Sequence, residues 1–314
     1  MTAKPYATVH AGELAKRTAP LSWIVEGIFL EAGAGILGGA PKSYKSFFAL
    51  DLCVAIASAT PCAGTFRVLK PGPVVVLCAE DPDAVISQRL VALSLARGRE
   101  LDDLPIQILV EPVRLPEGLD RLEATIAASQ PRLLLLDPLI RLHRADENSA
   151  SEMSVILDGL RKLARSSKTS ILLVHHTRKA PAGNAGTGLR GSSDLHAFGD
   201  SNLYLRKLAQ EVLELKIEHR AAATPAPVRL KLHVAEGNSP SARFCAVERK
   251  DQEDPAAHRV LDLLTKSTEA LTSAVLREKL GVRNQTVADA LKHLLAEGRI
   301  ERTGRDGWRV TRPG

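Results

Sequence analysis

Short, almost continuous apolar runs alternate with longer segments of helical periodicity over residues 30–235, and this alternation limits the possible folds more than any other feature of the chain. The strand-length apolar runs are 35–39, 73–79, 106–110, 132–137 and 170–176. Runs without polar alternation are typical of strands that are buried on both faces of a sheet. The segments between them carry apolar residues at helical spacing. The sequence therefore predicts an α/β fold with a mostly parallel sheet flanked by helices.

The composition excludes several classes of protein. Of the 314 residues, 45% are hydrophobic and 25% are charged, and no apolar run approaches the roughly 18 residues that a membrane helix needs. The four cysteines form no CxxC pair, which argues against a zinc site and against a disulfide framework. The N-terminal residues lack the apolar core of a secretory signal. We expect a cytoplasmic protein with no membrane partner.

Positive charge is concentrated near the C-terminus. Residues 255–314 hold 11 Lys and Arg against 7 Asp and Glu, whereas the preceding residues hold 31 against 29. Residues 237–256 are polar and interrupted by Pro240 and Pro255, a composition that favours a connector. We therefore expect a large domain of residues 1–250 and a small basic domain of residues 251–314. The basic domain suggests an anionic partner.

The first apolar run leads directly into a loop and then into a helix. The loop reads Gly39, Ala40, Pro41, Lys42, Ser43, Tyr44, Lys45, Ser46. In a phosphate-binding loop (P-loop), backbone N–H groups and a helix N-terminus surround the phosphates, a lysine reaches the β and γ oxygens, and a hydroxyl binds Mg²⁺. Lys45 and Ser46 would take the last two roles. The plain alternative is that this Lys-Ser pair only starts a helix.

Tyr44 is the one departure from the P-loop pattern. The motif G-x-x-x-x-G-K-[ST] has its second glycine at this position. If the position needs a positive φ, a tyrosine there costs about 1–2 kcal/mol. Such a loop could bind nucleotide and still turn it over slowly.

Two carboxylates follow buried strands, at the edge where ligands of open α/β sheets bind. Asp137 could hold the metal together with Ser46, although an Asp before Pro138 is also a common way to end a strand. Glu80 ends an earlier strand and could orient the attacking water. Asp81 and Pro82 come next, and capping of the following helix is the plain alternative for Asp81 and, to a lesser degree, for Glu80.

Three motifs after the P-loop, AEDPDAVISQR, LLLLDP and ILLVHHTRK, together resemble the RecA-type ATPase core. In particular, residues 20–215 resemble the hexameric replicative helicases of broad-host-range plasmids and their phage and genomic relatives. The resemblance implies ATP and Mg²⁺ as cofactors and a homo-oligomer, as a hexamer, with sites between subunits. It also implies that Lys45 and Ser46 bind phosphate and Mg²⁺, that Asp137 is the Walker B carboxylate, and that Glu80 is the catalytic base.

The same resemblance assigns roles to residues around the phosphates. Arg89 would be a nearby arginine of the phosphate site, and His175 or His176 would sense the γ-phosphate and relay its presence to DNA-binding loops. A histidine pair at a strand end is equally often a hydrogen-bonded core or rim pair. The candidates for a basic residue that enters the neighbouring subunit's site are Arg190, Arg206 and Lys207.

Residues 177–193 form a Gly- and Ala-rich loop with basic ends, which cannot pack a core. In the resembled ATPases, the equivalent loop lines the central channel of the ring and touches the nucleic acid backbone. Arg178 and Lys179 are therefore candidate DNA contacts, with solvated loop charges as the alternative.

The basic C-terminal region has the pattern of three helices followed by a hairpin. Helical spacing covers residues 255–267, a second short helix ends before Gly281, and a third begins at Asn284 and ends at Gly298. An Asp-Gly pair at 306–307 then predicts a tight hairpin. This order resembles a winged helix-turn-helix domain, in which the third helix reads bases and the hairpin contacts phosphates. The DNA-contact candidates are Arg283, Gln285, Thr286, Arg302, Arg305 and Arg309.

The leading interpretation is a Mg²⁺-dependent ATPase that acts on DNA as a ring-forming replicative helicase of a mobile element. Single-stranded DNA would lie in the ring channel and duplex DNA at the winged helix. A first alternative is a nucleotide-controlled DNA-binding regulator with slow ATP turnover, which Tyr44 favours. A second is an ATPase whose winged helix docks a primase or an initiator protein.

Overall fold

The structure is a computed structural model, and it describes residues 6–18, 20–176, 193–208, 212–235, 240–247, 255–267, 269–296, 298–303 and 307–311. The chain divides into two compact units, Met1–Val247 and Glu248–Gly314. Within the described ranges, no helix combines the length and the apolar character that crossing a membrane requires.

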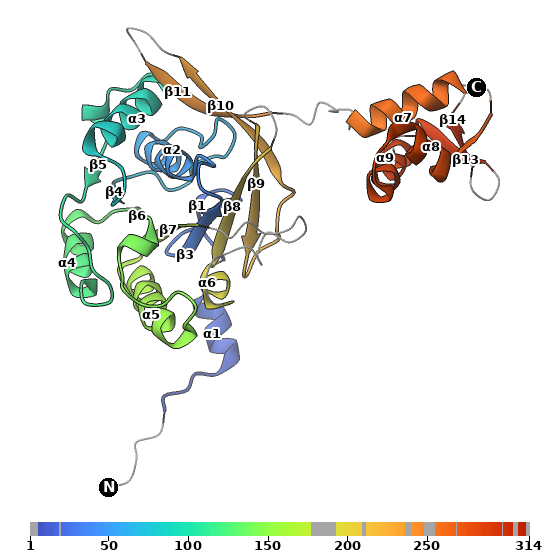
Figure 1. The fold of residues 1–314 in the computed structure, drawn as a ribbon. Helices are drawn as coiled ribbons and strands as arrows, with labels where there is room; N and C mark the ends of the chain where they lie inside the picture. Colours follow the sequence, from blue (N-terminus) through green and yellow to red (C-terminus); the bar gives the residue numbers. More distant parts are fainter. Residues whose placement is uncertain are drawn as a thin grey trace. The chain divides into compact units, whose positions relative to one another are not determined.

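A single large sheet forms the centre of the first unit (Figure 1). Among the described residues it has nine strands, in the order β11, β10, β9, β8, β3, β7, β6, β4, β5. The strands from β8 to β5 are parallel to their neighbours, which confirms the predicted mostly parallel sheet. The strands β9, β10 and β11 extend the sheet in antiparallel fashion. The bounds are β3 (Ala34–Gly39), β4 (Val74–Cys78), β5 (Ile106–Ile108), β6 (Leu133–Asp137), β7 (Ser170–His176), β8 (Ser201–Lys207), β9 (Val212–His219), β10 (Val228–Ala235) and β11 (Ser241–Ala246).

Helices cover both faces of this sheet (Figure 1). One face carries α2 (Lys45–Ser58) and α3 (Asp83–Leu95), and the other carries α4 (Leu119–Ser129), α5 (Ala150–Ser167) and α6 (Ser193–Phe198). In β6, Leu133 and Leu135 belong to the core around α2 and α3, whereas Leu134 and Leu136 belong to the core around α4 and α5. Burial on both faces is therefore the reason that this strand is apolar throughout. The remaining elements of the unit are α1 (Ala11–Arg17), β1 (Trp23–Val25), β2 (Phe29–Leu30), η1 (Leu101–Asp103) and η2 (Leu139–Arg141).

The last strand of the antiparallel extension returns to the P-loop helix. It is β11, which lies inside residues 237–256, so the prediction that this whole segment is a connector is wrong. The ring centroid of Phe244 in β11 lies 6.0 Å from that of Phe47 and 5.5 Å from that of Phe48, both in α2. The edge of the sheet therefore covers the helix that starts at the P-loop.

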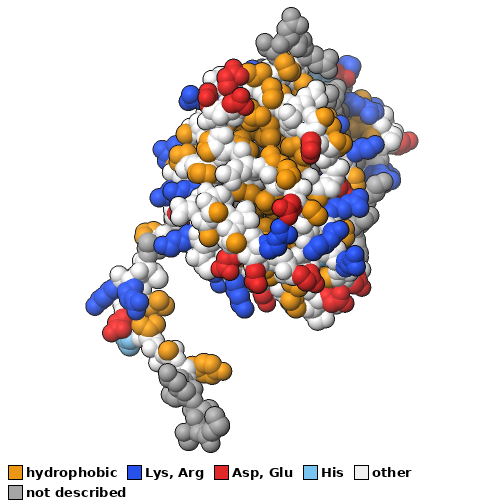
Figure 2. Space-filling view, turned by 90° about the vertical axis from the view of Figure 1, so that its left-hand side faces the viewer, with side chains coloured by type: hydrophobic (Ala, Val, Ile, Leu, Met, Phe, Trp, Pro, Cys, Tyr) orange, Lys and Arg blue, Asp and Glu red, His pale blue; other side chains and the backbone are white. Residues whose placement is uncertain are grey.

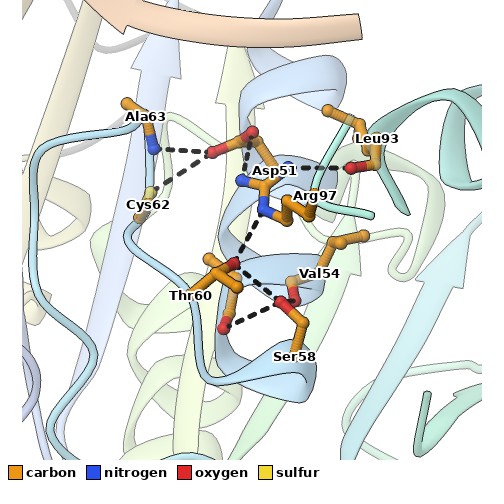
Figure 3. Close-up of polar contacts among 9 residues, drawn as sticks. Asp51, Val54, Ser58, Thr60, Cys62, Ala63, Leu93 and Arg97 are labelled. Atoms are coloured by element: carbon orange, nitrogen blue, oxygen red, sulfur yellow. Dashed lines mark hydrogen bonds and ion pairs between the residues drawn. The ribbon is translucent and has the colours of Figure 1, made fainter. Parts of the chain in front are cut away.

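A buried ion pair ties α2 to the end of α3 (Figure 3). Arg97 Nη2 lies 2.7 Å from Asp51 Oδ1, and the two side chains are 9% and 0% exposed. The other Asp51 oxygen accepts a hydrogen bond from the Ala63 backbone N–H at 2.9 Å. Arg97 also donates to Thr60 Oγ1 at 3.0 Å and to the Leu93 carbonyl at 3.0 Å. Because the buried charges are paired and hydrogen-bonded, they fix α2, α3 and the turn at residues 60–63 relative to one another.

The second unit has its own apolar core. Its elements are α7 (Pro255–Lys266), β12 (Leu271–Thr272), α8 (Ser273–Leu280), α9 (Asn284–Ala296), β13 (Ile300–Thr303) and β14 (Gly307–Val310). The three strands form an antiparallel sheet in the order β12, β14, β13. Leu264, Leu276 and Leu291 lie in the core, and Trp308 packs against it. The element order agrees with the expected helices and hairpin, and the assignment as a winged helix stays a prediction.

Substitution of Arg97 tests the ion pair of Figure 3. We expect Arg97→Ala to lower the free energy of unfolding of the first unit by about 3–5 kcal/mol, because it leaves the buried Asp51 carboxylate uncompensated. Urea unfolding in a Trp308→Phe background measures this, since Trp23 then reports on the first unit alone.

The matched control is Arg121→Ala. Arg121 pairs with Glu111 at 2.6 Å, but the two side chains are 74% and 70% exposed. Its loss should cost less than about 1 kcal/mol. Equal losses in the two variants would contradict the structural role of the buried pair.

Candidate functional site

The P-loop joins β3, at the centre of the sheet, to α2. Gly39 ends β3 and lies opposite Leu205 of β8. A Cβ atom at Gly39 would lie 2.5 Å from the Leu205 carbonyl oxygen and 2.8 Å from Ser43 Oγ, so this position requires glycine. Tyr44 directly precedes α2 with φ 63° and ψ 22°. The position does adopt a positive φ, so the tyrosine carries the cost of about 1–2 kcal/mol.

Lys45 points back into the loop. Its side chain is almost buried, and Nζ donates a hydrogen bond to the Ala40 carbonyl at 2.8 Å. Burial lowers the pKa of the Lys45 ammonium, and the Asp137 and Glu80 carboxylates oppose this shift. Ser43 Oγ is buried without a hydrogen-bond partner in the part of the chain that the structure describes. A phosphate at this helix N-terminus would satisfy both groups.

The remaining P-loop residues face solvent. Ala40, Pro41 and Lys42 are exposed, and Lys42 has φ 60°. All three belong to the predicted ATP-binding set, and their backbone lies between β3 and the start of α2, as the P-loop pattern requires.

Ser46 and Asp137 meet at the carboxyl end of the sheet. Asp137 ends β6, and its carboxylate accepts a hydrogen bond from the Ser46 hydroxyl. Burial raises the pKa of Asp137 to about 6; the Asp81 and Glu80 carboxylates add to the rise, and Ser46 and Lys45 oppose it. A hydroxyl and a desolvated carboxylate in contact are oxygen ligands of the kind that Mg²⁺ takes, with phosphate oxygens and waters in the rest of its shell. The residues present therefore fit Mg²⁺ and a nucleotide phosphate.

Glu80 and Arg89 both form ion pairs close to β4. Glu80 Oε1 accepts a hydrogen bond from Arg141 Nε at 2.8 Å, and the two side chains are 39% and 62% exposed. Arg89 in α3 pairs with Asp81. The alternative that Asp81 or Glu80 caps α3 does not hold, since the N-cap is Pro82 and no side-chain hydrogen bond caps the helix.

The histidine pair ends β7, the neighbour of the P-loop strand. In the parallel register, His175 lies opposite Gly38 and His176 opposite Gly39. His175 is 1% exposed, and its Nδ1 lies 3.5 Å from Glu147 Oε1. Both histidines therefore lie beside the strand that leads into the P-loop, and the sensor role stays a prediction.

The described candidates for a residue that enters a neighbouring site contact their own chain. Arg206 Nη2 lies 2.8 Å from Glu214 Oε1, and Lys207 Nζ lies 5.3 Å from the ring centroid of Tyr44. Lys207 is thus beside the P-loop of its own subunit. The other basic candidates of this region, Arg178, Lys179 and Arg190, lie outside the described residues.

The DNA-contact candidates on α9 are in its first turn or just before it. Arg283 and Gln285 are exposed, and Thr286 is half-buried. Gln285 Nε2 donates to Asp289 Oδ1 at 2.9 Å. An acidic residue therefore lies on the face that would read bases.

The hairpin candidates lie on β13 and β14. Arg302 Cζ lies 5.7 Å from the ring centroid of Trp308. Arg309 Nε lies 2.5 Å from Glu301 Oε1. The third hairpin candidate, Arg305, lies outside the described residues.

Arg141 and Glu147 contact the site but carry no sequence pattern that would reveal them. They lie in the segment between β6 and α5, and their partners Glu80 and His175 are distant in sequence. The only available indication is that this segment directly follows Asp137, where ligand-binding loops of open sheets lie.

The family comparison covers more than half of the chain. Residues 2–182 match the model of the AAA_25 family, described as an AAA domain. The chain belongs to this family. The matched region contains the P-loop, Glu80, Asp137 and both histidines.

Two solved structures are similar to the chain. A DnaB-like replicative helicase, solved in a study of its interactions with primase, aligns with a TM-score of 0.53 and 15% identity over 70% of this chain and 62% of that chain. The chain thus spans less than two thirds of that helicase chain. The RadB recombinase aligns with a TM-score of 0.48 and 16% identity over 65% of this chain and 88% of that chain. The likeness to the helicase shows the fold, and the predicted RecA-like class is confirmed.

Asp137→Asn should stabilise the protein in the absence of metal and nucleotide. The folded-state pKa, about 6, lies above the ordinary value of 3.8, so Asp137 lowers stability as the pH rises through this interval and the loss persists above it. We expect a gain of about 1–3 kcal/mol near pH 7.5 that disappears near pH 4. Chemical unfolding at both pH values measures it.

The control for this prediction is Asp102→Asn, at an exposed position. It should change the unfolding free energy by less than about 0.5 kcal/mol at either pH. A gain from Asp137→Asn that is the same at both pH values would refute the electrostatic cause.

Proposed function

We propose that this AAA_25 protein is a Mg²⁺-dependent ATPase that acts on DNA as a ring-forming replicative helicase of a mobile element. The observation that carries the proposal is the meeting of the buried Lys45 with the Ser46–Asp137 contact at the carboxyl end of the sheet. Burial disfavours both the Lys45 ammonium and the Asp137 carboxylate in the free protein, and a nucleotide phosphate with its metal would compensate both charges.

Each side chain has one task in this proposal. Lys45 exchanges its hydrogen bond to Ala40 for phosphate oxygens. Ser46 and Asp137 would hold the cation, and Mg²⁺–ATP would supply the phosphoryl group together with positive charge that neutralises it. Glu80 orients the attacking water and accepts its proton, which is a task for an accessible carboxylate, and its side chain is 39% exposed.

The proposal that the protein acts on DNA rests on the order of the motifs and on the basic second unit, Glu248–Gly314. The motifs AEDPDAVISQR, LLLLDP and ILLVHHTRK resemble those of ring helicases, and the similar DnaB-like protein is a replicative helicase. In a hexameric ring, Arg178 and Lys179 would contact single-stranded DNA in the channel. One of Arg190, Arg206 and Lys207 would stabilise charge in the neighbouring site.

A nucleotide-controlled DNA-binding regulator is the second candidate. Tyr44 favours it, because a tyrosine at φ 63° with Lys207 over its ring restricts the P-loop more than a glycine would. A regulator of this kind binds ATP, hydrolyses it slowly and shows no acceleration by single-stranded DNA.

The third candidate function is that the second unit docks another protein. Asp289 and Glu301 engage two of the predicted DNA contacts, and acidic residues on this face weaken phosphate binding. The similar DnaB-like helicase was studied with its primase. A replication protein is therefore the occupant that this candidate names.

Steady-state ATP hydrolysis with and without single-stranded and duplex DNA tests the proposal. We expect strong stimulation by single-stranded DNA and loss of turnover by a factor of roughly 10² or more in Glu80→Gln, which should still bind ATP. Lys45→Ala should lose measurable ATP affinity, because the buried ammonium is the main charge facing the phosphates.

The outcomes separate the candidates. ATP binding with slow turnover that DNA leaves unchanged would favour the regulator. Wild-type ATP affinity in Lys45→Ala would refute the P-loop assignment, and full turnover in Glu80→Gln would move the base to another residue.

A salt titration tests whether the second unit binds DNA. Duplex affinity of the full chain should fall steeply between about 50 and 200 mM salt, because each neutralised phosphate releases counterions. Arg302→Ala, in the hairpin that is predicted to contact phosphates, should reduce the slope of log K against log salt by about 1, whereas Arg121→Ala in the first unit should leave it unchanged. Fluorescence anisotropy with a labelled duplex measures both, and absence of duplex binding would favour the docking role.

A further inference from the structure

One short segment touches two parts of the candidate site that are otherwise far apart in sequence. This β6–α5 segment, residues 138–149, begins directly after Asp137 and ends where α5 begins. From it, Arg141 holds Glu80 at 2.8 Å and Glu147 lies 3.5 Å from His175. We infer that the β6–α5 segment couples the candidate base Glu80 to the candidate sensor His175, with Arg141 and Glu147 as positioning residues. This inference rests on the proposed function.

The segment is anchored firmly enough to transmit a displacement. Leu139 and Leu142 are buried in the core around α4 and α5. The Leu142 carbonyl accepts a hydrogen bond from the Leu115 N–H at 2.7 Å, and the Arg141 carbonyl accepts one from Arg114 Nη1 at 2.7 Å. Ser149 then caps α5 through the Glu152 N–H. The segment is therefore buried at Leu139 and Leu142 and hydrogen-bonded near both of its ends, and close-packed interiors of this kind have few intermediate arrangements.

The Glu147–His175 contact is buried and the Arg141–Glu80 pair is exposed. We therefore expect a displacement to pass from β7 to Glu80. The side chains of His175 and Glu147 are 1% and 15% exposed, so their contact joins the segment to β7 in the interior. The Arg141–Glu80 pair is 62% and 39% exposed, and exposed pairs contribute little net stability. A shift at the end of β7 should therefore move the segment and Arg141 with it, and the exposed Glu80 carboxylate should follow the Arg141 guanidinium that holds it at 2.8 Å.

The position of Glu80 depends on Arg141 because few other groups hold it. Glu80 follows β4 in a turn, and Arg141 Nε is the donor to its Oε1 among the described contacts. Asp137, Arg141 and Glu147 follow one another within eleven residues of the chain. The candidate metal ligand, the residue that holds the candidate base and the residue that contacts the candidate sensor therefore lie on one continuous segment. His176 ends β7, and the proposed DNA-contact residues Arg178 and Lys179 follow this strand in the sequence.

A double-mutant cycle on kcat tests this coupling. We expect Arg141→Ala and Glu147→Gln each to lower kcat roughly tenfold while the KM for ATP changes less than about threefold, because both act on the base and not on phosphate binding. Arg141→Lys should recover part of the loss. The double variant should lose no more than the worse single variant, since both substitutions break the same coupling.

Matched controls separate the possible failures. Arg121→Ala removes an exposed ion pair elsewhere and should leave kcat unchanged, and thermal unfolding of all variants checks that they fold. Wild-type kcat in either single variant, or losses that multiply in the double variant, would overturn the coupling. A wild-type protein without ATP hydrolysis would instead overturn the proposed function, and the coupling with it.

Discussion

Burial of α2 is the constraint on which the rest of the structure depends. Nearly every residue of this helix is buried, between the sheet on one side and α3 and β11 on the other. The P-loop is held at both ends, because Gly39 lies in the central strand and α2 lies in the core. The buried Asp51–Arg97 ion pair also holds α2 in place inside that core. A phosphate-binding loop gains affinity when its N–H groups are fixed before the ligand arrives, and this packing fixes them.

The parallel strands of the sheet can be predicted from the sequence, whereas the antiparallel strands are harder to predict. Strands buried on both faces leave a continuous apolar run, which β6 and β7 illustrate. In β9, buried residues alternate with half-buried ones, a period of two that the sequence does carry in VLELKIEH. In β11, only Ala242 and Phe244 are buried, and Pro240 precedes them. Such a strand has the composition of a connector, and only its contacts with α2 and α3 reveal it.

The candidate site divides in the same way. Lys45, Ser46, Asp137 and Glu80 can be found from sequence because each sits at the end of a strand or the start of a helix, where backbone geometry alone determines its place. Arg141 cannot, and neither can the place of Lys207 beside Tyr44, because both depend on which distant strands become neighbours. Once β3 pairs with β8, the end of β8 lies beside the P-loop, and Lys207 stacks on the Tyr44 ring. A residue predicted for a neighbouring subunit's site thus contacts its own loop.

Two kinds of local cost occur together at the P-loop, and the electrostatic one supports a ligand site independently of any resemblance. Lys42 and Tyr44 adopt φ of 60° and 63°, and they are two of the seven described non-glycine residues with a positive φ; the other five lie at helix ends and turns elsewhere in the first unit. Burial shifts the pKa of Lys45 downward and that of Asp137 upward, so each charge is disfavoured where it stands. Departures of this electrostatic kind are common at functional sites. A ligand that carries negative charge towards Lys45 and a cation towards Asp137 would stabilise both charged side chains at once. Binding would then be strong, because burial of these charges raises the free energy of the unliganded site.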